Sequence, residues 1–117
     1  MASKIDLALA KSLIKEFQLQ NASANGPALK TPDGPFLNGF FIDRESLDAI
    51  LSNPKVVGLS VNFAKHPDFV GAKDNVFTLI LAGAEPNTAP DSATPYVNNG
   101  DIYSDTPWCP PFCINLG

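Results

Sequence analysis

The two cysteines carry the most distinctive chemistry of this sequence. Cys109 and Cys113 lie four positions apart, with two prolines between them. Thiols at such a spacing can form a disulfide, bind a soft metal ion or take part in redox exchange. They can also pack as small apolar side chains.

A disulfide between the cysteines requires a turn. If the two prolines adopt the polyproline conformation, the Cα atoms of Cys109 and Cys113 lie roughly 12 Å apart. A disulfide needs about 4.4–6.8 Å. A cis Cys109–Pro110 bond could supply the turn, because prolyl bonds adopt the cis form at modest cost. The spacing therefore favours free, packed thiols and leaves the bridged pair as an alternative.

A metal site would need ligands beyond the two cysteines. Protein-bound zinc usually has four ligands. His66 is the only histidine, and Asp68 or Asp105 would have to complete the set unless a second chain supplied another cysteine pair. Thioredoxin-like exchange favours two residues between the cysteines, whereas three are present here. We predict no cofactor or metal, and keep Cys109, Cys113 and His66 as the candidates for a metal- or thiol-dependent protein.

The remaining titratable residues have structural explanations. His66 precedes a proline in a predicted turn, and no neighbouring nucleophile indicates a catalytic triad. Asp43, Glu45 and Asp48 could form a general acid–base cluster. The first two instead fit the N-cap and first turn of a helix, and Asp48 fits its solvated face. No glycine-rich phosphate loop is present. The sequence favours a protein without catalytic residues.

The cysteines belong to an apolar tail, residues 108–117, which follows a Pro-rich loop at 85–107. A flexible coil of that loop's length spans roughly 26 Å, enough for the tail to reach its own domain or another chain. Rigid aromatic side chains often dominate protein interfaces. The candidate interaction residues are Trp108, Phe112, Ile114 and Leu116. We predict a non-enzymatic protein-interaction module, as a homodimer or bound to another protein.

Charge and hydropathy narrow the class of partner. The net charge is −4, and the eight lysine and arginine residues are scattered along the chain. Nucleic acids and anionic membranes attract clustered basic residues, so neither is an expected partner. Lysines and an aspartate interrupt the N-terminal apolar residues, so no secretion signal is expected. We predict a cytoplasmic protein with no membrane-spanning helix.

The elements that position these residues follow from hydrophobic periodicity. In chain order we predict a helix over 4–19, a loop over 20–35, a strand over 36–42, a helix over 44–52, strands over 55–64 and 76–84, and a short strand near 102–103. The first helix places Ile5, Leu9, Leu13 and Phe17 on one stripe. Its lysine-rich opposite face would also suit a membrane surface. Packing against the core is the favoured interpretation, and a capping box from Ser3 to Asp6 would start the helix.

These elements predict an α+β fold. A small, mainly antiparallel sheet of three or four strands would be covered on one face by two helices, and a long Pro-rich C-terminal segment would follow. Residues 1–117 form one predicted domain, with its core in 36–84. The strands at 36–42 and 55–64 could also pair in parallel through a right-handed crossover.

Two strand motifs and the tail carry a resemblance to known sequences. The motifs are Val57-Gly58-Leu59-Ser60-Val61-Asn62-Phe63 and Thr78-Leu79-Ile80-Leu81-Ala82-Gly83, and the tail contributes Cys109 through Cys113. In these segments the chain resembles a group of small uncharacterised bacterial proteins. The resemblance covers about residues 40–84 and the tail. It implies a fold type and no catalytic residues.

Overall fold

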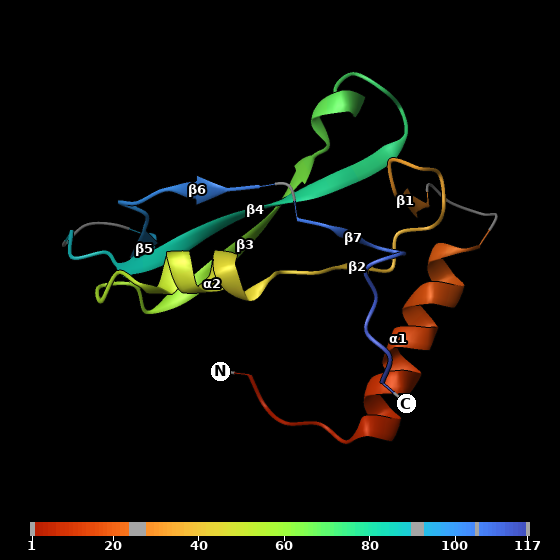
Figure 1. The fold of residues 1–117 in the computed structure, drawn as a ribbon, viewed down its shortest axis with the longest axis horizontal. Helices are drawn as coiled ribbons and strands as arrows, with labels where there is room; N and C mark the ends of the chain where they lie inside the picture. Colours follow the sequence, from red (N-terminus) through yellow and green to blue (C-terminus); the bar gives the residue numbers. More distant parts are fainter. Residues whose placement is uncertain (1, 24–27, 90–92, 105, 117) are drawn as a thin grey trace. The chain divides into compact units, whose positions relative to one another are not determined.

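The computed structural model describes residues 2–23, 28–89, 93–104 and 106–116. It confirms the α+β class, with two α-helices, a five-stranded mixed sheet and a two-stranded antiparallel sheet (Figure 1). The elements in chain order are α1 (Leu7–Asn21), β1 (Leu29–Lys30), β2 (Gly39–Phe40), α2 (Arg44–Leu51), β3 (Gly58–Lys65), the 3-10 helix η1 (Pro67–Phe69), β4 (Asn75–Pro86), β5 (Tyr96–Val97), β6 (Ile102–Tyr103) and β7 (Trp108–Cys109).

Strand β4 organises the larger sheet. It pairs in parallel with β1 and antiparallel with β5 and β6. It also pairs with β3. That pairing is antiparallel, because Val57 N–H donates to Ala84 O while His66 N–H donates to Val76 O. The predicted sheet of three or four strands is thus too small. Strands β1 and β5 fall in segments predicted as loop, 20–35 and 85–107, and are too short to show a period.

The chain forms two compact units. The first unit comprises residues 1–41, 66–77 and 107–117, and the second comprises residues 42–65 and 78–106. Both are assembled from separated stretches of sequence, so neither matches one contiguous segment. The assignment of 1–117 to a single domain stays a prediction.

The second unit contains α2, whose start and position follow the sequence prediction. The Asp43 side chain caps the helix, since Ser46 N–H donates to its Oδ2 at 3.3 Å. Ile50 is buried with Leu79 and Leu81. Gly83 permits close approach to the helix, because a Cβ there would lie 2.9 Å from Val56 Cγ2 and 3.2 Å from Ile50 Cγ2.

Removing the Asp43 cap tests this helix start. The hydroxyl of Ser46 donates to the carboxylate and keeps the pKa of Asp43 below its ordinary value of 3.8. A lowered pKa in the folded state means that the charged form stabilises the fold above pH 3.8 and that this contribution disappears as the pH falls through the folded pKa. We expect Asp43→Ala to lower the melting temperature at pH 7. The difference from wild type should shrink below pH 3.8 in thermal denaturation, and a constant difference would contradict the assignment.

The first unit contains α1, which starts three residues later than predicted. Asp6, and not Ser3, is the N-cap, and its side chain accepts a hydrogen bond from Ala8 N–H at 3.0 Å. At the other end the helix runs to Asn21, two residues beyond the predicted end. Asn21 is buried and fixes the following chain, because its side chain bonds the backbone of Leu29 and Leu37. Residues 24–27 of the predicted loop lie outside the described residues.

The strand predicted at 36–42 is reduced to the two residues of β2. It pairs antiparallel with β7, with Gly39 opposite Cys109 and Phe40 opposite Trp108. The alternative of parallel pairing between 36–42 and 55–64 is therefore wrong. Within the first unit this small sheet fixes the beginning of the cysteine tail.

Candidate functional site

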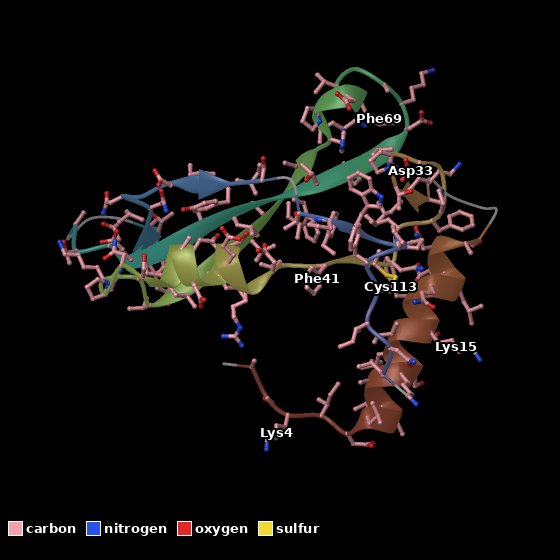
Figure 2. The ribbon with its side chains drawn as sticks, viewed as in Figure 1. Lys4, Lys15, Asp33, Phe41, Phe69 and Cys113 are labelled. Atoms are coloured by element: carbon pink, nitrogen blue, oxygen red, sulfur yellow. A yellow bond between two sulfur atoms is a disulfide. The ribbon has the colours of Figure 1, made fainter. Side chains whose placement is uncertain are left out.

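A hollow of the first unit lies between α1, β2 and the tail. It has a volume of about 590 Å³, and we call it the α1 groove. Its apolar lining consists of Ile14, Phe40, Phe41, Phe112, Ile114 and Leu116. Lys11 and Lys15 also line it, as do both cysteines. Figure 2 labels Lys15 on the helix, and Cys113 beside the sulfur–sulfur bond.

The two cysteines form a disulfide bond. Their Cα atoms are 4.8 Å apart, and both the Cys109–Pro110 and Pro110–Pro111 peptide bonds are cis. The prediction of free, packed thiols is therefore wrong, because it assumed an extended polyproline segment. The chain instead reverses in a tight turn, where Phe112 N–H donates to Trp108 O at 3.1 Å and Cys113 N–H donates to Pro111 O at 2.9 Å.

The tail is anchored at its beginning and exposed farther on. Asn38 N–H donates to Cys109 O, and Phe41 N–H donates to Pro107 O, each at 2.8 Å. Trp108 is half-buried. By contrast, Phe112 is 54% exposed and Ile114 is 80% exposed. Hydrogen bonds thus fix β7 to the neighbouring segment, while the residues after it form one exposed wall of the α1 groove. Residue 117 lies outside the described residues.

His66 has a structural position in the first unit. Its Nδ1 accepts a hydrogen bond from Asp68 N–H at 3.2 Å and so caps η1. Its ring meets the rings of Phe69 and Trp108 edge-on, at centroid distances of 5.5 and 6.2 Å. The structure thus brings His66 next to the tail, where it packs against the residue that precedes Cys109.

The metal-site hypothesis finds no ligand set in the described part of the chain. Within those ranges no three His, Cys, Asp or Glu side chains lie close enough to share a metal ion. The bridged cysteines are not thiolates, which are the form that binds metals. Asp105, one of the considered ligands, lies outside the described residues.

The apolar side chains of α1 are not buried, contrary to the prediction that the helix packs against the core. Their exposed fractions run from 42% at Ile14 to 64% at Leu19. The exposed set is Ile5, which precedes the helix, and Leu7, Leu9, Leu13, Ile14, Phe17 and Leu19. Of the predicted stripe, Leu9, Leu13 and Phe17 lie on α1, whereas Ile5 precedes it. Periodicity shows which side chains share a helix face. It does not tell whether a helix buries its stripe in its own chain or leaves it exposed, so this part of the site was missed.

Few apolar side chains are buried elsewhere. Among the described residues, five large apolar side chains are buried and eighteen are exposed. Contiguous exposed apolar surface on a small protein usually marks an interaction site. Seven of the eighteen lie on α1 or just before it, and of these the lining of the α1 groove includes Ile14. The other α1 residues in that lining are Lys11, Lys15 and Gln18.

The charge of the chain is divided unevenly between the units. The first unit contains five basic and five acidic residues and is neutral overall. The second unit contains three basic and seven acidic residues and carries the whole net charge of −4. Contacts between two copies of this chain are therefore least opposed by charge repulsion when they use the first unit.

Among the described helices, none has the length and hydrophobicity needed to cross a membrane. Comparison of the chain with protein-family models, with curated protein sequences and with solved structures found no match.

Proposed function

We propose that this protein is a non-enzymatic interaction module that self-associates through the exposed apolar residues of α1. The observation that carries the proposal is the exposure of the whole apolar stripe, with Leu13 at 55% and Phe17 at 43%. Exposed stripes of this kind bind another apolar surface, because their removal from water is favourable by about 25 cal/mol per Å².

A second copy of the chain fits this surface. A two-fold interface uses the same patch on both subunits, so the patch must be complementary to itself. The stripe presents the exposed apolar side chains of Leu9, Leu13 and Phe17, so the stripes of two copies can cover each other. The neutral charge of the first unit supports the same partner.

The substitution Leu13→Asp tests the interface. It places a charge in the middle of the stripe, where dimer formation would bury it. Substitutions at the centre of an interface can lower the binding free energy by about 2 kcal/mol or more. We expect the dimer dissociation constant to rise at least about thirty-fold in sedimentation equilibrium. The matched control is Phe63→Asp, which makes the same kind of change at a side chain of the second unit that is 83% exposed. It should leave the constant unchanged.

Three results would overturn the proposal. Wild-type protein could remain monomeric at all accessible concentrations, or the control could weaken the dimer as much as Leu13→Asp does. Wild-type protein could instead float with vesicles of anionic lipid while Leu13→Asp does not, which would identify the stripe as a membrane-binding surface. Circular dichroism of both variants confirms that the helix content is retained.

A further inference from the structure

We propose that the Cys109–Cys113 bond is a site of thiol–disulfide exchange with a dithiol reductant, and that its redox state controls the shape of the α1 groove. The exchange step is independent of the proposed function. Only its effect on self-association rests on that function.

The bond is accessible to an attacking thiolate. Cys113 is exposed, Cys109 is half-buried, and both line the open α1 groove. Exchange requires a thiolate to reach one of the two sulfur atoms, so exposed disulfides react and buried ones resist. The exposed apolar side chains around the bond, Phe41 and Phe112, offer a contact surface to a protein reductant.

The bond also joins a fixed part of the chain to an exposed part. Cys109 belongs to β7 and is held to the neighbouring strand by the hydrogen bond from Asn38. Cys113 belongs to the exposed segment 111–115, and Ile114 and Leu116 after it contribute to the groove lining. The turn between them has two short-range hydrogen bonds, those donated by Phe112 and Cys113. Breaking the covalent link therefore loosens the turn at residues 112 and 113 and leaves the strand pair in place.

The exchange balances as a two-electron reduction. A thiolate of the reductant attacks Sγ of Cys113, the sulfur–sulfur bond breaks, and Cys109 leaves as a thiolate that takes up a proton. The second thiol of the reductant then attacks its own sulfur in the mixed disulfide and releases Cys113, which is also protonated. The chain gains two electrons and two protons, and the dithiol becomes a disulfide.

Reduction of the native protein by a small dithiol tests the proposal. We expect dithiothreitol, without denaturant, to make two thiols available for alkylation, detected by mass spectrometry. In hydrogen exchange at a dilution where the protein is monomeric, the amides of Phe112 and Cys113 should exchange at least about tenfold faster after reduction. The amides of Asn38 and Phe41 serve as internal controls and should keep their protection. Trp108, the only tryptophan, should report the change through its fluorescence.

The double substitution Cys109→Ser with Cys113→Ser is the matched control for reductant effects. It should reproduce the fast exchange of residues 112 and 113 and should not respond to dithiothreitol. The proposal is overturned if the bond is reduced only in denaturant, or if reduction leaves these two amides unchanged. If the wild type is monomeric and the amides of residues 112 and 113 still exchange faster after reduction, self-association is refuted and the exchange site is supported. If the protein is a dimer and its dissociation constant does not change on reduction, the redox state of the bond does not control self-association.

Discussion

Asn21→Ala is expected to lower the free energy of unfolding by about 3 kcal/mol. The Asn21 side chain donates from Nδ2 to Leu29 O at 3.0 Å and to Leu37 O at 3.1 Å, and its Oδ1 accepts from Leu29 N–H at 2.8 Å. Leu29 O keeps the bond from Leu37 N–H. The substitution therefore leaves Leu29 N–H and Leu37 O without their side-chain partner. Each such buried or part-buried group costs about 1–3 kcal/mol of stability. Urea denaturation measures the loss.

Two control variants separate the hydrogen bonds from the helix itself. Gln20→Ala changes an exposed neighbour in α1 and should alter the free energy of unfolding by less than about 0.5 kcal/mol. Asn21→Asp keeps the acceptor for Leu29 N–H and loses the two donors, so its effect should approach that of alanine. If Asn21→Ala behaves like Gln20→Ala, the side chain does not hold the end of α1 to the following segment.

Leu81→Ala is expected to cost about 3 kcal/mol of unfolding free energy. Leu81 has no exposed surface and lies opposite Tyr103 in the pairing of β4 with β6. Truncating a buried leucine removes its transfer free energy and leaves a cavity, which together amount to about 2–5 kcal/mol. Since few large apolar side chains are buried in this chain, a loss of this size is a large share of a typical stability of 5–15 kcal/mol.

The matched control for Leu81 is Phe63→Ala on β3. Phe63 is 83% exposed, so its truncation should leave the unfolding midpoint nearly unchanged in dilute protein. A midpoint shift at Phe63 as large as that at Leu81 would show that the apolar face of β3 is buried in solution. Equal slopes of the denaturation curves would confirm that neither variant changes the extent of unfolding.

The sequence predicted those elements whose side-chain period is long enough to be recognised. The helix at 44–52 has a capping aspartate and a clear apolar face, and the structure places α2 at Arg44–Leu51. The strand predictions at 55–64 and 76–84 correspond to β3 and β4, and that near 102–103 corresponds to β6. The two-residue strands β1, β5 and β7 carry no period, because their positions are set by partners distant in sequence.

The candidate site was predicted in part. Trp108, Phe112, Ile114 and Leu116 were identified by their type, and three of them line the α1 groove while Trp108 forms β7. The bridge was underestimated because the path through two prolines depends on long-range pairing with β2, which spacing alone does not reveal. Likewise, the exposure of α1 depends on what the rest of the chain buries, and a helical period contains no information about that.

The division of the first unit into distant segments has a consequence for biosynthesis. Strand β2 finds its partner only in β7, which the ribosome adds about seventy residues later. Domains usually begin to fold while they are being translated, at about 5–20 residues per second. Strand β2 therefore spends several seconds with its backbone hydrogen-bonding groups unpaired in a unit that is still incomplete. Early encounters with chaperones should accordingly involve the segment around β2.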